Sequence, residues 1–295
     1  MRRVLLAVLI LALVGAAGFW FLTRPETISA SALAPHTPNL ENGKVMFFAG
    51  GCVACHQTPK QDDRMRLGGG MELKSPYGSF YPPNISPDPK DGIGAWNEAQ
   101  FLTAMLKGTS PDGRHYFPSF PYASYQRMTQ ADLRDMFAFI KTLPPVQGRV
   151  RDHDIRFPFN VRLALGGWKF LYLDGRPFTP DPNQPAQWNR GAYLVNGPAH
   201  CAECHSPRTL LGGIVDEKRF AGGPNPDGEG TIPNITQHAL GEYSVKDIER
   251  ILETGETPED TVGGSMLPVV RNTSQLPQSD RAAMAAYIKS LPPAQ

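Results

Sequence analysis

Charge is scarce in this sequence and balanced in sign. Only 19% of the 295 residues are Asp, Glu, Lys or Arg, and the formal net charge is +1. A chain of this kind has no strong field of one sign, so its composition does not favour a nucleic acid or a strongly acidic partner. The sequence also lacks a phosphate-binding loop, a dinucleotide-binding fingerprint and a Ser/His/Asp arrangement with supporting spacing. It therefore offers no separate catalytic constellation.

Cysteine is scarce as well, and all of it lies in two short motifs. The four cysteines and the histidine that follows each pair are Cys52, Cys55, His56, Cys201, Cys204 and His205. In the pattern Cys-x-x-Cys-His, two thiols bond the vinyl groups of one porphyrin, and the histidine is placed to ligate the iron. A zinc site or a redox dithiol is the alternative for a single copy. Two copies that use every cysteine favour two covalently bound haem c groups, and they leave no thiol for a disulfide.

Glycine and proline, in contrast, are abundant, at 29 residues each. This content is well above ordinary usage and predicts a loop-rich protein. A covalently held porphyrin would fill an interior that regular structure leaves incomplete. The length of the chain is sufficient for two domains with cores of their own.

Two arginines precede a long uncharged run at the N-terminus. The run covers residues 4–23, and Arg24-Pro25 ends it. As a helix it would be about 30 Å long, which matches the hydrocarbon core of a bilayer. A cleaved signal peptide is the alternative, with Gly15-Ala16-Ala17 as the cleavage site. We favour an uncleaved anchor because the apolar run continues past that site to Trp20, a residue suited to the membrane interface. Both interpretations export the rest of the chain.

The remainder of the chain repeats one order of features. Each half has a glycine-bearing helix before the motif, a Pro-Asn-Ile-Ser/Thr loop after it, and two capped helices, the last ending at Leu-Pro-Pro. The corresponding positions are Gly43 and Gly191, Asn84 and Asn234, Asn97 and Ser244, Thr129 and Ser279, and Leu143 and Leu291. The asparagine follows the motif histidine by 28 residues in the first half and by 29 in the second. This agreement indicates a duplicated module. In the first half, Thr129 with Asp132 forms a variant of the capping box.

These features divide the chain into five parts. The expected parts are 1–25, an anchor or signal segment; 26–40, a tether; 41–147, the first domain; 148–187, a linker; and 188–295, the second domain. The tether is rich in Ser, Thr, Ala and Pro, a composition that forms no fold of its own. The linker carries Trp168, Tyr172 and Phe178, and we expect it to pack against a domain.

Each half resembles a class I cytochrome c. The exported chain is similar to the membrane-anchored di-haem cytochrome c subunits of periplasmic alcohol, sugar-acid and aldehyde dehydrogenases. The matching stretches include residues 81–88, 116–122 and 266–273. The resemblance implies a mainly α, loop-rich fold of tandem class I cytochrome c domains behind an N-terminal transmembrane helix. It also implies that the first and last helices of each domain cross at a glycine, Gly43 with Phe137 and Gly191 with Tyr287.

Met266 is the expected distal ligand of the second haem. It lies in a loop after Gly263-Gly264-Ser265, off any helical stripe, whereas Met284 has core spacing within the last helix. A thioether opposite the histidine raises the reduction potential of the haem.

The first half departs from its relatives at this ligand. The relatives often have Pro-Ala-Met-Pro-Tyr at the stretch that is Pro-Ser-Phe-Pro-Tyr, residues 118–122, in this chain. Phe120 thus replaces the methionine, and phenylalanine cannot ligate iron. Met128, immediately before the cap residue Thr129, is the nearest remaining thioether, and its alternative role is a hydrophobic staple. His115 is the second candidate, and an open or water-bound position is the third. We therefore expect two inequivalent haems, the first with the lower potential.

Several other residues are weaker candidates for haem contact. Asn84, Asn234 and Arg208 would hold a haem edge or a propionate, or would act as ordinary turn and surface residues. His200, beside Cys201, is expected at the surface.

The pattern as a whole predicts electron transfer rather than an enzyme in its own right. The two haems would carry electrons from a periplasmic dehydrogenase to an oxidase, a quinone or a soluble cytochrome. The expected location is a bacterial inner membrane, with the haem domains facing the periplasm, because the N-terminal arginines stay in the cytoplasm. A di-haem enzyme such as a peroxidase is the alternative, since it needs an open distal site.

Overall fold

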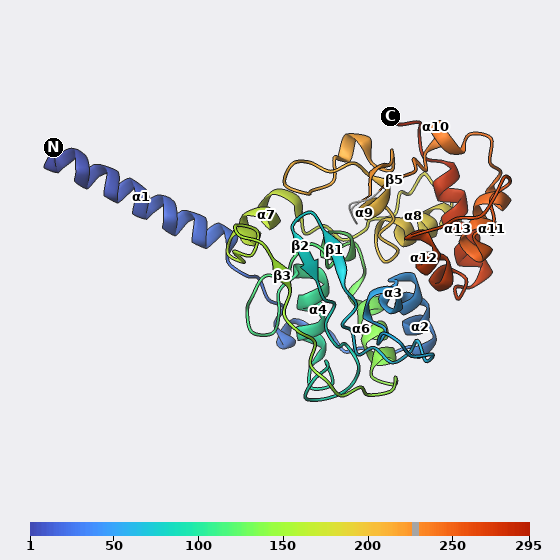
Figure 1. Ribbon diagram of the computed structural model, residues 1–295, viewed down its shortest axis with the longest axis horizontal. Coiled ribbons are helices and arrows are strands. Elements are labelled where there is room, and N and C mark those ends of the chain that lie inside the picture. Colours follow the sequence, from blue (N-terminus) through green and yellow to red (C-terminus); the bar gives the residue numbers. More distant parts are fainter. Residues whose placement is uncertain (226–229) are drawn as a thin grey trace.

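The molecule consists of one long helix and a rounded body (Figure 1). The computed structural model describes residues 1–225 and 230–295. The body contains two helical domains joined by a linker, and its few strands are short. The predicted mainly α, loop-rich class is confirmed.

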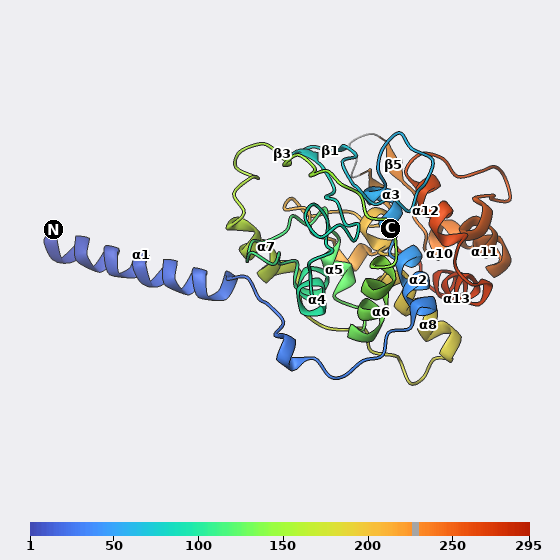
Figure 2. The ribbon, with the colours of Figure 1, turned by 90° about the horizontal axis from the view of Figure 1, so that it is seen from below.

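Helix α1 (Arg2–Thr23) is the apolar N-terminal run. It has 22 residues and a mean hydropathy of 2.6, so it is long and apolar enough to cross a membrane. At 1.5 Å per residue it measures about 33 Å. Figure 2 shows the same helix standing clear of the body for most of its length.

The first domain is built from helices around a small antiparallel sheet of order β1-β2-β3. Its elements are α2 (Leu40–Ala49), α3 (Cys52–His56), β1 (Leu73–Ser75), β2 (Gly78–Phe80), α4 (Glu98–Lys107), α5 (Tyr122–Tyr125) and α6 (Gln130–Ile140), with β3 (Asp154–Ile155) supplied by the linker. The linker also forms α7 (Ala164–Tyr172).

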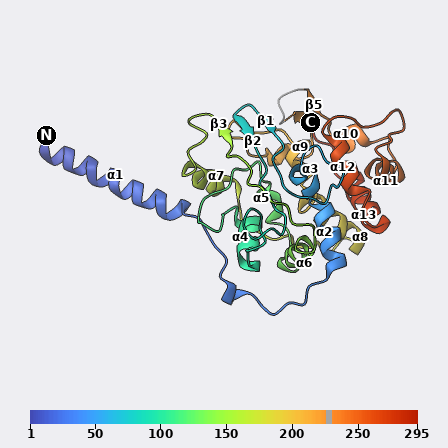
Figure 3. The same ribbon diagram turned by 60° about the horizontal axis from the view of Figure 1, so that its bottom comes forward.

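The second domain repeats this helical plan. Its elements are α8 (Ala186–Asn196), α9 (Ala202–His205), the 3-10 helix η2 (Asp216–Lys218), β4 (Gly223–Pro224), β5 (Thr231–Ile232), α10 (Gln237–Leu240), α11 (Val245–Thr254), α12 (Met266–Thr273) and α13 (Gln278–Lys289). Figure 3 shows α8 and α13 of this domain beside α2 and α6 of the first.

In each domain the first and last helices cross at a glycine. A Cβ atom at Gly43 would lie 2.1 Å from the carbonyl oxygen of Asp135, and one at Gly191 would lie 1.9 Å from that of Ala283. Because no real Cβ atom tolerates such distances, only glycine lets the two helix backbones approach this closely. The predicted crossing is therefore present in both domains.

The aromatic partner of this crossing matches the prediction in one domain only. The Cβ of Tyr287 faces Gly191, as expected, but Gly43 faces Phe139 and not Phe137. Phe137 stacks on Phe101 instead, with ring centroids 4.7 Å apart. Two residues along a helix correspond to a rotation of about 200°, so Phe137 points to the other side of α6.

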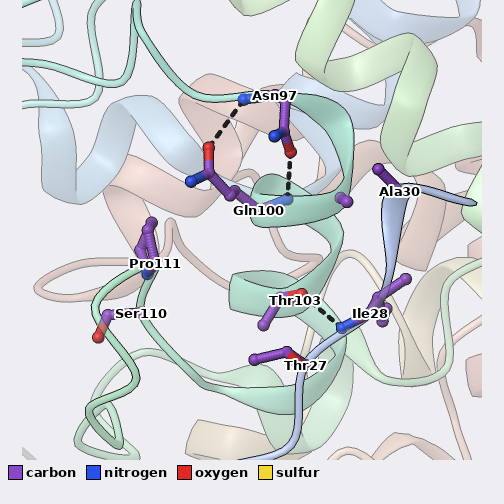
Figure 4. Close-up of a pocket in the computed structure, with 9 residues that line it drawn as sticks. Thr27, Ile28, Ala30, Asn97, Gln100, Thr103, Ser110 and Pro111 are labelled. Atoms are coloured by element: carbon purple, nitrogen blue, oxygen red, sulfur yellow. Dashed lines mark hydrogen bonds between the residues drawn. The ribbon is translucent and has the colours of Figure 1, made fainter.

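The segment between α1 and α2 is docked on the first domain. It forms only one short 3-10 helix, η1 (Ala30–Ala32), as expected of a tether. However, the backbone N–H of Ile28 donates to Thr103 Oγ1 at 2.9 Å, and Glu26 pairs with Lys107 at 2.7 Å. Figure 4 shows this segment running alongside α4, whose N-terminus is closed by the Asn97–Gln100 capping box. The tether is therefore a fixed part of the body.

The linker packs against both domains, as its apolar content predicted. Trp168 meets the ring of Tyr122 in the first domain at 6.0 Å and donates from Nε1 to the carbonyl oxygen of Leu211 in the second at 2.9 Å. Further along, Phe178 packs on Tyr193 of α8 at 5.6 Å. These contacts hold the two domains in one arrangement.

Replacing the glycine at a helix crossing should destabilise the protein. In Gly191→Ala the new methyl group overlaps the Ala283 carbonyl, and overpacking of this kind costs roughly 1–3 kcal/mol. Denaturant unfolding of the haem-loaded protein measures the change. Gly263→Ala is the control, because a Cβ there meets no atom within 4 Å. Equal losses in the two variants would contradict the close crossing.

Candidate haem-binding sites

The two Cys-x-x-Cys-His motifs have the same local structure. The first motif lies entirely within α3. In the second, α9 begins directly after Cys201, whose own backbone is already helical, with φ −54° and ψ −35°. A helical turn places residues i and i+3 on one face, so each pair of thiols faces the same side.

Each motif histidine is oriented by a proline carbonyl. His56 Nδ1 lies 2.8 Å from the carbonyl oxygen of Pro83, and His205 Nδ1 lies 2.8 Å from that of Pro233. Because a carbonyl only accepts, Nδ1 carries the proton and Nε2 is left with the lone pair that a metal binds. Burial lowers the pKa of both imidazoles, although the carbonyl contact opposes this effect. Neutral, oriented imidazoles of this kind fit haem iron.

The loops that supply these carbonyls are held by their asparagines. Asn84 accepts from a backbone N–H two residues on, at 2.9 Å, and donates to the carbonyl oxygen of Val146 at 2.7 Å. Asn234 makes the same pair of bonds, and its carbonyl acceptor is Ala294, at 2.7 Å. Each asparagine thus ties the histidine-orienting loop to the chain beyond the last helix. This role is more specific than the turn predicted as one alternative from the sequence.

The thiols suit covalent attachment better than dithiol or zinc chemistry. Burial raises the pKa of both Cys52 and Cys201 to about 12, whereas a reactive dithiol needs a lowered thiol pKa. Within residues 1–225 and 230–295, no three His, Cys, Asp or Glu side chains are grouped so that they could hold a metal ion. A haem c group needs fewer protein ligands than such a metal site, because one histidine and two thioether bonds hold it.

The two motifs approach each other at the domain interface. The ring of His200, just before Cys201, packs edge-on against Tyr125 with centroids 5.6 Å apart. The hydroxyl of Tyr125 donates to the carbonyl oxygen of Gly50 at 2.8 Å, two residues before Cys52. The expectation that His200 lies at the surface is wrong in part, because its side chain is half-buried against a tyrosine of the other domain. A short chain of contacts therefore links one attachment motif to the other.

Helix α12 adds a second connection between the sites. Met266 is the first residue of this helix, and not a loop residue as expected, and it is half-buried. Pro268 does not prevent the helix, since the first turn tolerates proline. The helix contacts α2 and α3 of the first domain. The predicted ligand of one haem therefore belongs to a helix that leans on the attachment helix of the other.

The two candidate distal ligands of the first haem, Met128 and His115, lie in different parts of the structure. Met128 is buried, and its Cγ lies 3.7 Å from a Cβ built on Gly197 of the second domain. Leu276, also buried, holds the same place before α13. This match supports the packing role that the sequence left open for Met128, and ligation by Met128 stays a prediction.

His115 lies where helix α1 meets the body. Its carbonyl oxygen accepts from Arg162 at 2.8 Å, and its Nε2 lies 3.0 Å from a Cβ built on Gly166 of α7. Burial, then the charge of Lys169, lowers the pKa of its imidazole to about 4. Phe120, in contrast, packs on Tyr125 at 5.7 Å, close to the first motif.

Two charged groups beside the second motif are already engaged. Arg208 pairs with Glu203 of the motif at 2.8 Å, and Glu203 also accepts from Ser124 of the first domain at 2.7 Å. Arg208 is therefore neither a simple exposed arginine nor an uncommitted partner for a propionate.

Tyr193 forms an interface bond that sequence reasoning missed. Its hydroxyl accepts the backbone N–H of Thr129 at 3.2 Å and donates to the carboxylate of Asp132. Thr129 still caps α6 by accepting from the backbone N–H of Asp132 at 3.0 Å. The predicted capping box is thus only half formed, because a tyrosine from the second domain supplies the other half.

Comparison with known proteins agrees with this geometry. A family model described as Cytochrome c matches residues 40–144 and 189–292. The chain is 48% identical over 297 residues to a protein named "Diheme cytochrome c-type" from Cereibacter sphaeroides, covering 99% of both. It is 34% identical over 275 residues to the fructose dehydrogenase cytochrome subunit of Gluconobacter japonicus, covering 91% of this chain and 56% of that one. It is 36% identical over 285 residues to the cytochrome c subunit of a quinone-dependent alcohol dehydrogenase of Gluconacetobacter polyoxogenes, covering 90% of this chain and 59% of the relative.

Removing the Tyr193 hydroxyl should loosen the domain interface. Tyr193→Phe leaves Asp132 and the Thr129 N–H without this partner, at a cost of roughly 1–3 kcal/mol for a part-buried bond to a charged group. Tyr243→Phe is the control, since its hydroxyl bonds Glu259 within one domain at 2.5 Å. Thermal unfolding of both holoproteins measures the difference. If the two variants unfold alike, the interface does not depend on Tyr193.

Proposed function

Because this chain belongs to the cytochrome c family, we propose that it carries electrons from a dehydrogenase to the respiratory chain. It is a di-haem c-type cytochrome with two covalently bound haem c groups. When bound, haem supplies one-electron chemistry, and the protein determines its orientation, spacing and potential. The observation that carries the proposal is the contact between the two motifs, because a relay within one chain needs its haems close together.

The chain's own residues provide the attachment. We assign the first haem to Cys52, Cys55 and His56 and the second to Cys201, Cys204 and His205. The bonds from His56 and His205 to proline carbonyls support this assignment, since they leave on Nε2 the lone pair that a metal would bind. Met266 is the proposed distal ligand of the second haem. The first haem keeps Met128, His115 and an open position as alternatives.

The electron donor is proposed from the names of the relatives. Those compared include cytochrome subunits of fructose dehydrogenase and of a quinone-dependent alcohol dehydrogenase. The chain spans 56% and 59% of these two relatives, so their substrates are not carried over. These relatives are carrier subunits, which supports an electron carrier and gives no support to the peroxidase alternative. The acceptor is an oxidase, a quinone or a soluble cytochrome.

The proposed location is a bacterial inner membrane. Helix α1 supports an anchor there, because it is long and apolar enough to span a bilayer. Arg2 and Arg3 at its start favour a cytoplasmic N-terminus, which places both haem domains in the periplasm.

The haem content gives the first test. Fully matured protein should retain two porphyrins after denaturation, as measured by the intact mass. The double variant Cys201→Ser with Cys204→Ser should retain one, because the thioethers of only one motif remain. Release of either porphyrin from the unaltered chain would show that it is not covalently attached.

The reduction potentials test the ligands. Potentiometric titration should resolve two steps, and Met266→Ala should lower the higher one by on the order of 100 mV, a fraction of the ~0.8 V that axial ligands control. Met128→Ala should change the spectrum of the first haem only if Met128 ligates it. Two coincident steps with identical His/Met spectra would contradict the expected lower potential of the first haem, and with it a flow of electrons from the first haem to the second.

A further inference from the structure

The linker exposes an apolar surface beside the end of α1. We call this surface the linker patch; its residues are Phe157, Phe159, Val161, Leu163, Phe170 and Leu171. The side chain of Phe157 is 80% exposed and that of Phe170 is 64% exposed. So many large apolar side chains exposed in one segment indicate a contact with something other than water.

The position of α7 fixes the depth of this patch relative to α1. A Cβ on Gly166 would lie 2.3 Å from the carbonyl oxygen of Thr23, and one on Gly167 would lie 3.5 Å from the ring of Phe19. Phe19 and Thr23 are one helical turn apart, about 6 Å along the axis. Since α1 is just long enough to span the hydrocarbon core, its last turn lies at the bilayer boundary. Figures 1 and 2 both show α7 at this end of α1.

Helix α7 is also fixed to the body. The ammonium group of the buried Lys169 donates to the carbonyl oxygens of Lys107 and Gly108, at 2.7 and 2.6 Å. These carbonyls end α4, where a positive charge is favourable. Because α7 binds α1 on one side and α4 on the other, the patch cannot move away from the membrane helix without breaking these contacts.

The charge of the segment suits a lipid surface. Residues 155–173 contain no Asp or Glu, although Asp154 and Asp174 flank them, and the cations among them that are not buried are Arg156 and Arg162. Arg156 is exposed beside Phe157. Aromatic rings with neighbouring cations are the side chains that settle among lipid headgroups, especially anionic ones.

The second domain extends the same surface. Leu210, 95% exposed, and its neighbour Leu211 lie in a loop that is held to α7 by the bond from Trp168 Nε1 to the Leu211 carbonyl. The linker and the second domain therefore both present apolar side chains next to α7.

We propose that the linker patch, with Leu210 and Leu211, lies in the headgroup–acyl boundary of the bilayer that α1 spans. This inference rests on the proposed membrane anchor. The body is then held against the membrane in one orientation, with α1 and α7 as two parts of a single attachment. A dehydrogenase subunit seated on the patch is the competing occupant, but it would have to reach the depth of the last turn of α1.

The test is photo-cross-linking of the full-length, haem-loaded chain in vesicles of phosphatidylethanolamine and phosphatidylglycerol. A photoreactive p-benzoylphenylalanine replaces Phe170, or, as a matched control, Val245 of α11 at the opposite end of the body (Figure 1). Mass spectrometry should find lipid adducts at position 170 and several-fold fewer at position 245. Phe170 and Val245 are both exposed, so neither replacement disturbs the core.

Any other result would contradict either the membrane anchor or the position of the linker patch. A chain that fails to float with the vesicles overturns the anchor and the linker patch with it. A chain that floats but forms equal adducts at the two positions overturns the linker patch alone. Capture of a dehydrogenase subunit by position 170 in native membranes would also overturn the linker patch and leave the anchor standing. A further variant carries Phe170→Asp and Leu171→Asp, with the photoreactive group at position 163. It should capture several-fold less lipid than the same probe in the chain without the two aspartates. Unchanged capture would contradict the proposal.

Discussion

The hydrogen bond from each motif histidine to a proline carbonyl is the constraint on which both sites depend. It fixes the tautomer of His56 and His205 and the direction of the metal-binding nitrogen. The carbonyl is in turn held by an asparagine that bonds the chain beyond the last helix. That helix reaches its place only because a glycine lets it cross the first helix of the domain. The orientation of the histidine therefore depends on the loop, and the loop depends on the helix crossing. Both domains contain this arrangement.

The domain interface connects the two copies of this structure. His200 and Tyr125 connect the motifs, and Tyr193 joins α8 to the N-terminus of α6. Because the contacts of His200 and Tyr125 lie beside the attachment segments, they fix the position of one segment relative to the other. A relay requires such control of the cofactor positions.

The features that follow from local patterns could be predicted from the sequence. The motifs, the apolar N-terminal helix, the helix caps at Asn97, Thr129 and Ser244, and the duplication all depend on spacing within a short window. The start expected at Ser279 is wrong, because α13 begins at Gln278, directly after Pro277. The features that were missed depend on residues far apart in the chain. His200 and Tyr193 contact residues of the first domain, and Gly43 faces Phe139 because of the rotation of α6. Likewise, the segment expected to be a loose tether is held by Thr103 and Lys107.

One interface connects the two attachment motifs, so the two haems should sit at a fixed separation. Pulsed electron paramagnetic resonance on the fully oxidised, full-length protein measures the dipolar coupling between the two ferric irons. The account predicts a single, narrow distribution of iron–iron distances, because the motifs are connected through His200 and Tyr125. A broad distribution, or no coupling between two fully loaded sites, would contradict it.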